Sequence, residues 1–212
     1  MKATPIVAAA LLVLTASGAA ARDAFAPEPS YADFGPALSR DGTRLAFLRE
    51  GITSSRLVRY QSLYVARRDG RNAVALTKGA LQSADNIGAG HFDGVVSASW
   101  SPDGSHLVYA HNYAASGNDY VHSELVIVDA DGTHPRQLTR TDQSSGFMRA
   151  TWPSWSPAGD RIVFAAAGQI EVINADGSGL TQLTPGAYDS DPTWSQDGSK
   201  IAFIRGATTT CR

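Results

Sequence analysis

The most constraining feature of this 212-residue chain is a sequence repeat that occurs three times in full and begins a fourth time. Each unit opens with a large apolar residue, followed at once by serine and, four positions after the opening, by glycine. An aliphatic residue comes next, with an aromatic residue two positions later. The opening residues are Leu38, Trp100, Trp155 and Trp194. Repetition in step is typical of arrays in which each unit buries its face against its neighbours.

Within each unit the apolar residues alternate with a period of two, which predicts β-strands. A Ser-Pro-Asp-Gly turn or a relative separates the first two strands, as at 101–104, and a second Asp-Gly turn follows, as at 131–132. Aspartate bonds its own backbone in such turns and glycine accepts a positive φ. We therefore interpret Asp103 as a turn residue and not as a catalytic carboxylate. Ala158 takes its place in unit three, which suggests that this aspartate is dispensable.

The sequence thus predicts an all-β fold, a β-propeller of four-stranded antiparallel blades. In the third blade the four strands should cover residues 150–155, 161–166, 169–174 and 180–184. Prolines 36, 153 and 192 should begin first strands, where a missing N–H is harmless. The tryptophans should fill the space between blades. The basic residues that follow each first turn should be solvated or locally paired; they are Arg44, His106, Arg161 and Lys200.

The predicted domain organisation follows the repeat. We expect a signal peptide at 1–21, an extended segment at 22–33, blade 1 at 34–77, blade 2 at 95–139, blade 3 at 150–184, half a fourth blade at 188–205 and a tail at 206–212. The signal peptide rests on a positive start, a short apolar stretch and small residues at 19–21. No cysteine near this region supports a lipid anchor, and no later stretch is apolar enough to cross a membrane. The chain is therefore expected in the periplasm or outside the cell.

Composition excludes some function classes. The net charge of −2 gives no electrostatic footprint for nucleic acid. The single cysteine, Cys211, excludes an internal disulfide. No Gly-x-Ser-x-Gly elbow, Walker loop or dinucleotide fingerprint occurs. We therefore predict no catalytic residue, no cofactor and no metal site.

The Trp-Ser-Pro-Asp-Gly run at 100–104, its aliphatic-x-aromatic strand, the Asp-Gly turn and a later Leu-Thr pair resemble the repeat of TolB-like β-propellers. The resemblance covers roughly residues 34–204. Such WD40-like propellers occur in TolB, the periplasmic partner of the Tol envelope system, and in the N-terminal domains of prolyl-oligopeptidase-type enzymes. The resemblance implies a ring of six or more blades, of which this chain supplies about three and a half.

Three explanations of the incomplete ring stay open at this stage. The chain could be a truncated reading frame, it could be completed by a second copy or another partner, or residues 23–34 could add a strand to the half blade. An open arc of blades leaves a sheet face exposed to solvent, which is why the incomplete ring needs an explanation.

The units differ most in two connections, between strands two and three and between successive blades. In a four-stranded meander both connections emerge at one rim, opposite the Asp-Gly turns. Enlarged loops on a rigid scaffold are the usual place for binding. We therefore predict a binding face made of Arg59, Tyr60, His91, Phe92, Asp93, His111, Tyr113, Tyr120, His122 and Phe147.

The favoured function is an exported, non-catalytic module that binds a protein of the cell envelope, with self-association as a further expectation. The alternative is a propeller that binds or processes a glycan or a peptide. A third hypothesis is a fragment with no function of its own. Turnover abolished by His91→Ala or Asp93→Ala would favour the alternative.

Overall fold

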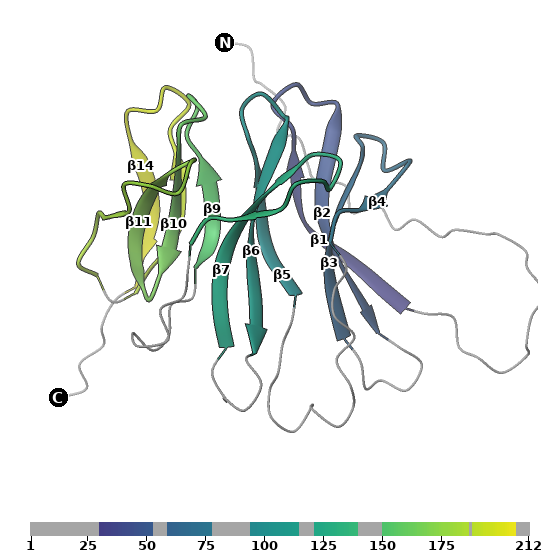
Figure 1. Ribbon diagram of the computed structural model, residues 1–212, viewed down its shortest axis with the longest axis horizontal. Helices are drawn as coiled ribbons and strands as arrows, with labels where there is room; N and C mark the ends of the chain where they lie inside the picture. Colours follow the sequence, from purple (N-terminus) through teal and green to yellow (C-terminus); the bar gives the residue numbers. More distant parts are fainter. Residues whose placement is uncertain are drawn as a thin grey trace, which may run out of the picture.

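The computed structural model describes residues 30–52, 59–77, 94–114, 121–139, 150–186 and 188–206. Every regular element in these ranges is a β-strand, and none is a helix that could cross a membrane. The strands form narrow sheets that stand side by side along the chain (Figure 1). The predicted signal peptide and the tail beyond residue 206 lie outside the described residues.

Three four-stranded blades and one two-stranded half blade follow one another. Blade 1 contains β1 (Ser30–Leu38), β2 (Arg44–Ile52), β3 (Arg59–Arg67) and β4 (Val74–Ala75). Blade 2 contains β5 (Gly94–Trp100), β6 (His106–Ala114), β7 (Val121–Asp129) and β8 (Arg136–Gln137). Blade 3 contains β9 (Thr151–Trp155), β10 (Arg161–Ala166), β11 (Gln169–Asn174) and β12 (Thr181–Gln182). Half blade 4 contains β13 (Asp189–Trp194) and β14 (Ile201–Arg205).

Within each blade, consecutive strands pair antiparallel, as a meander requires. Blades 1 and 2 touch through one parallel bridge between Gln61 and Gly94, which joins them formally into one sheet. The predicted fold class is confirmed, and the strands predicted for blade 3 agree with β9 to β12. Residues 30–34 belong to β1 and pair with β2. The explanation that residues 23–34 add a strand to the half blade is therefore wrong for residues 30–34, because these residues form the first strand of blade 1. Residues 23–29 lie outside the described residues.

The first turn of each blade is held by a serine and an aspartate. Ser101 Oγ donates to Asp103 at 2.6 Å, and the Ser105 N–H donates to the same carboxylate at 3.0 Å. This confirms a structural role for Asp103. In blade 3, where alanine replaces that aspartate, Ser156 Oγ instead donates to Asp160 at 2.7 Å. The turn of blade 3 thus keeps a serine–aspartate hydrogen bond, with the aspartate two positions later.

The aspartates of these turns should make the fold less stable in acid. Hydrogen bonds from Ser39 and Thr43 lower the pKa of Asp41 to about 2, and equivalent bonds from Ser195 and Ser199 lower that of Asp197 to about 2. A pKa below the unfolded value means that the ionised form stabilises the fold. This contribution is complete above about pH 4 and is lost as the pH falls towards 2.

We therefore expect the free energy of unfolding, measured by urea titration, to fall between pH 4 and 2, and to fall less in Asp41→Asn. The matched control is Asp69→Asn in the second turn of blade 1. Within the described residues, the Asp69 carboxylate accepts from the Arg71 N–H but from no serine hydroxyl. An equal acid response in wild type and Asp41→Asn would contradict the assignment.

The core consists of layers between blades. Ala46, Leu48, Leu63 and Val65 of blade 1 pack against Trp100, Leu107, Tyr109 and Val126 of blade 2. A second cluster joins blades 2 and 3 around Phe164, and a third joins blade 3 to Trp194 and Ile201 of half blade 4. Blades 2 and 3 therefore each have one face towards the preceding blade and one towards the next, and burial of these faces holds the array together.

Trp100, Trp155 and Trp194 lie at these layers, as predicted, whereas Trp152 does not and is 44% exposed. The Trp100 indole N–H donates to the Ala37 carbonyl of blade 1 at 2.9 Å. The prediction for the basic residues agrees with His106 and Arg161, which lie beside Asp129 and Asp160, and with Lys200, which is exposed. Two of the four residues also reach the next blade. The Arg44 guanidinium lies 4.7 Å from the centre of the Trp100 ring and bonds the Gly104 carbonyl, and that of Arg161 lies 5.0 Å from the centre of Trp194. Two of these positions therefore connect neighbouring blades through cation–π contacts.

Candidate functional site

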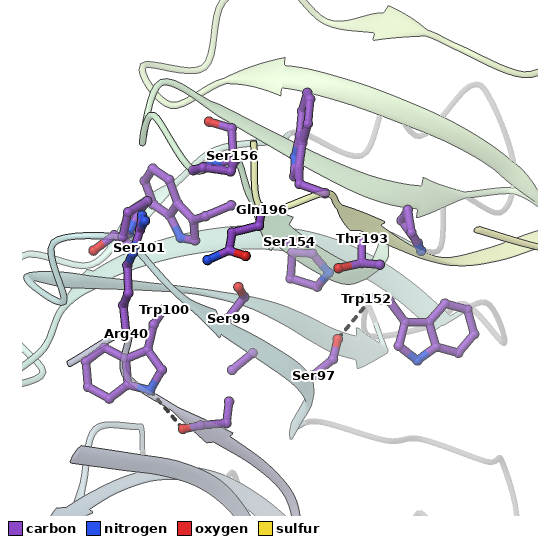
Figure 2. A pocket seen from close by; sticks show the side chains of 18 of the residues that line it. Arg40, Ser97, Ser99, Trp100, Ser101, Trp152, Ser154, Ser156, Thr193 and Gln196 are labelled. Carbon is purple, nitrogen blue, oxygen red and sulfur yellow. Dashed lines mark hydrogen bonds between the residues drawn. The ribbon is translucent and has the colours of Figure 1, made fainter. Parts of the chain in front are cut away.

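The first strands of all the blades line one groove. β1, β9 and β13 are edge strands of their sheets, and β5 is joined to β3 only by the bridge at Gly94. Together with the turns that follow them, these strands enclose about 540 Å³. Figure 2 shows Ser99, Ser154, Thr193 and Gln196 around the middle of this groove, with Trp100 and Arg40 towards one end and Trp152 at the other. A concave surface that crosses every blade is the natural place to bind an extended ligand.

Trp152 has the most unusual backbone in the groove. Its φ is +50°, a left-handed conformation that is uncommon for a bulky residue, and it directly precedes Pro153, which disfavours helical backbone at this position. The Trp152 N–H donates to Ser97 Oγ of the neighbouring blade at 3.0 Å (Figure 2). The side chain is 44% exposed. A strained residue that is held from another blade and presents its ring to solvent marks a candidate binding site.

The positive φ recurs at one level of the first strands. Gly35 and Asp191 have φ of +60° and +50° and stand immediately before Pro36 and Pro192, in the same register as Trp152. At this level the pairing of every first strand shifts register, which is the mark of a β-bulge. The three prolines therefore lie inside β1, β9 and β13. The prediction that they begin these strands was wrong, because the bulge removes the need for a ladder donor there.

The lining is rich in hydroxyl groups and poor in charge. Its ionisable side chains are those of Arg40 and Asp191. Ser190 Oγ donates to Asp191 at 2.9 Å, which orients that carboxylate at the bulge. Within the described ranges, no three His, Cys, Asp or Glu side chains gather as a metal site would require. The groove can thus offer hydrogen bonds and apolar contact to an uncharged segment.

A second cavity of about 620 Å³ adjoins the Trp152 end of the groove. The β10–β11 connection, Ala167–Gly168, lines it together with Trp152 and Tyr188, whose side chain is 61% exposed. Asp189 also lines it, and both of its oxygens accept from Arg205 at 2.8 and 2.9 Å. Two exposed aromatic rings therefore stand at the mouth of the groove, beside a charged pair that is already satisfied.

The strands that flank the enlarged connections end at one rim. Ile52 pairs with Arg59 and Ala114 with Val121, while the Asp-Gly turns lie at the opposite end of the strands (Figure 1). His111 and Tyr113 lie near this rim on β6, with ring centroids 5.4 Å apart and an interplanar angle of 29°.

His111 Nδ1 lies 3.5 Å from Glu124 Oε1 on the next strand, and the ring lines a cavity of about 240 Å³ between blades 1 and 2. Arg59 and Tyr60 begin β3, and His122 lies in β7 opposite Tyr113. The other predicted residues, His91, Phe92, Asp93, Tyr120 and Phe147, fall outside the described residues. The structure thus brings His111 and Tyr113 together; the predicted binding face as a whole stays a prediction.

The sequence analysis missed Trp152, Asp191 and Tyr188. One signal for the first was available, because Trp152 is the one tryptophan of the chain that lies outside the repeated Trp column. A large aromatic residue out of register with a repeat cannot fill the same gap between blades as its neighbours. Its bulge and its bond to Ser97 could not be foreseen, since they depend on contact between two blades.

Comparison with solved structures finds other β-propellers. A TolB-type protein from Agrobacterium tumefaciens aligns over 88% of this chain and 73% of its own, with a TM-score of 0.53 and 17% identity. The β-propeller domain of the Trilobed protease from Pyrococcus furiosus aligns over 82% and 48%, with a TM-score of 0.53 and 10% identity. An oligogalacturonate lyase in complex with manganese aligns over 81% and 46%, with a TM-score of 0.54 and 14% identity.

The chain therefore spans about three quarters of the first of these structures and less than half of the other two. No known protein-family model matches the chain, and no curated protein matches it. At such identities the likeness concerns the fold and does not extend to activity. The chain has the β-propeller fold that TolB-like and peptidase-type propellers share.

Proposed function

We propose that this chain is an exported, non-catalytic interaction module that binds a protein of the cell envelope, with an extended segment of the partner lying in the inner groove. The observation that carries the proposal is Trp152, an exposed ring at the groove mouth whose strained backbone is fixed by Ser97 of another blade. A large, preorganised aromatic residue is a favoured anchor in protein recognition, because little freedom is lost when it is covered.

The rest of the groove supports an extended, largely uncharged ligand. Within the described sheets β1, β9 and β13 each leave one backbone edge unpaired, and β5 is bridged to β3 only at Gly94. Serine and threonine side chains line the same groove. Backbone and hydroxyl groups together bind a peptide main chain through hydrogen bonds, while Trp152 and Tyr188 supply apolar contact.

Affinity capture from an envelope extract tests the proposal. We expect one defined protein to be recovered, and recovery to fall at least about tenfold with Trp152→Ala, as for a central aromatic anchor. A photo-crosslinking residue at position 193, in the groove, should label that protein. The matched control is position 74, where Val74 is 58% exposed on the far edge of blade 1. Val74→Ala should leave capture unchanged.

Two results would count against the proposal. Capture that is insensitive to Trp152→Ala, with no label from position 193, would place binding elsewhere. Reproducible turnover in a panel of hydrolase and lyase substrates, abolished by His91→Ala or Asp93→Ala, would replace it with the processing function.

A further inference from the structure

The contacts between blades are built from the same positions each time. On the face towards the next blade these are pairs two residues apart on the second strand: Ala46 and Leu48, Val108 and Ala110, Val163 and Ala165. They pack against the aliphatic and aromatic positions of the next blade, such as Leu107 and Tyr109. Each blade thus presents one face, here called the forward face, to the next blade. Its other face, the receiving face, packs against the preceding blade.

The outer face of blade 1 (Tyr31, Asp33, Leu38, Phe47, Arg49 and Tyr64) is a receiving face of this type. Arg49 donates to both oxygens of Asp33, at 2.7 and 2.8 Å, and its guanidinium lies 5.3 Å from the centre of the Phe47 ring. The Tyr31 and Tyr64 rings also lie under this guanidinium, at 4.5 and 4.7 Å. Leu38 and Tyr31 are 53% and 46% exposed.

Half blade 4 contains the same construction at the same spacing. Arg205 donates to both oxygens of Asp189, sixteen residues earlier, and lies 5.1 Å from the centre of the Phe203 ring. There the pair adjoins blade 3: Asp189 is 2% exposed, and its N–H donates to the Gly168 carbonyl at 2.8 Å. In half blade 4 the Asp189 end of this arrangement therefore packs against blade 3, whereas Arg205 and Phe203 stay 59% and 36% exposed.

The outer face of half blade 4 (Ala202 and Ile204) is a matching forward face. These residues stand at the positions of Ala46 and Leu48 in blade 1, and Ile204 is 59% exposed. Exposed apolar residues in the register of a buried interface favour a contact of the same kind. Leu38 replaces the usual tryptophan on the receiving side, so such a contact buries no indole N–H that needs an acceptor.

We propose that the outer face of blade 1 in one copy of the chain packs against the outer face of blade 4 in a second copy. The contact is head-to-tail and uses two different surfaces, so two copies related by a twofold axis make it twice and close a dimer. The interface continues the stacking of blades that the molecule already contains. It does not depend on the groove or on its ligand.

Sedimentation equilibrium of the full chain over a wide range of concentration tests this contact. We expect a reversible dimer, and we expect Leu38→Lys and Ile204→Glu each to raise the dissociation constant at least about tenfold. Val74→Glu is the matched control, since Val74 is equally exposed but lies on neither face, and it should dimerise as wild type. Circular dichroism and a thermal melt check that each variant is folded.

Mixing the two variants gives the sharper result. A Leu38→Lys copy and an Ile204→Glu copy together form one wild-type contact and one Lys–Glu contact, so the mixture should dimerise where neither variant does alone. A wild-type monomer at all concentrations would overturn the proposal, and so would a dimer that neither substitution weakens. Failure of the mixture to dimerise would exclude the head-to-tail contact. If identical faces met instead, one of the two variants would dimerise on its own as wild type does, because its contact face would be unchanged.

Discussion

Replacing Phe164 by alanine is expected to destabilise the protein by about 3–5 kcal/mol, the range for removing a large aromatic side chain from a core. The ring is 2% exposed and lies in the cluster that joins blades 2 and 3, among Val108, Ala110 and Ile162. Alanine would leave a cavity between two sheets whose backbones are fixed by their own ladders and cannot close on it.

The repeat supplies a matched control. Phe203 stands at the same position in half blade 4 but is 36% exposed, so Phe203→Ala should destabilise by less than about 1 kcal/mol. Urea titration with near-ultraviolet circular dichroism measures both. Equal effects of the two substitutions would mean that blades 2 and 3 do not share a close-packed layer.

The second large effect concerns Trp100. We expect Trp100→Ala to destabilise by about 3–5 kcal/mol, because it removes a 7% exposed ring, the cation–π contact with Arg44 and the bond to the Ala37 carbonyl. Trp100→Phe keeps a ring but loses the indole N–H, and should destabilise by about 1–3 kcal/mol since it leaves a carbonyl unpaired.

Trp194→Phe is the informative comparison. Among the described residues, the buried indole nitrogens of Trp155 and Trp194 have no hydrogen-bond partner. Removing an unpaired donor relieves a desolvation penalty, so Trp194→Phe should change the free energy of unfolding by no more than about 1 kcal/mol in either direction. The assignment of the Ala37 bond would be refuted if Trp100→Phe were as mild as Trp194→Phe.

The repeat made the blades predictable from the sequence because turns and strands depend on neighbours in the chain. The serine–aspartate turn at 101–103 and the four strands of blade 3 are local patterns of this kind. What the sequence did not predict depends on contact between blades. Arg44 reaches a ring 56 positions later; both residues stand in columns of the repeat, but the repeat alone does not show that the side chain crosses to the next blade. The contact from the Trp152 N–H to Ser97 leaves no periodic signal.

The candidate site was likewise predictable from the sequence only in part. The enlarged connections could be assigned to one rim because the meander fixes where each strand ends, and the register of Ile52 with Arg59 agrees. The inner groove was missed because its residues look like ordinary strand and turn residues, and only the arrangement of four first strands makes them a surface. The strain at Asp191 and Trp152 is a property of the bulge and not of the residue type.

The short β10–β11 hairpin has a practical consequence. At the equivalent place blades 1 and 2 carry connections over 53–58 and 115–120 between longer strands, whereas blade 3 turns through Ala167 and Gly168 with φ of +50° and +79°. The scaffold already tolerates longer connections at this position in two of its repeats, and the hairpin opens beside Trp152. A grafted loop could therefore be displayed here over the groove mouth, which makes blade 3 the natural point for engineering a new specificity into this protein.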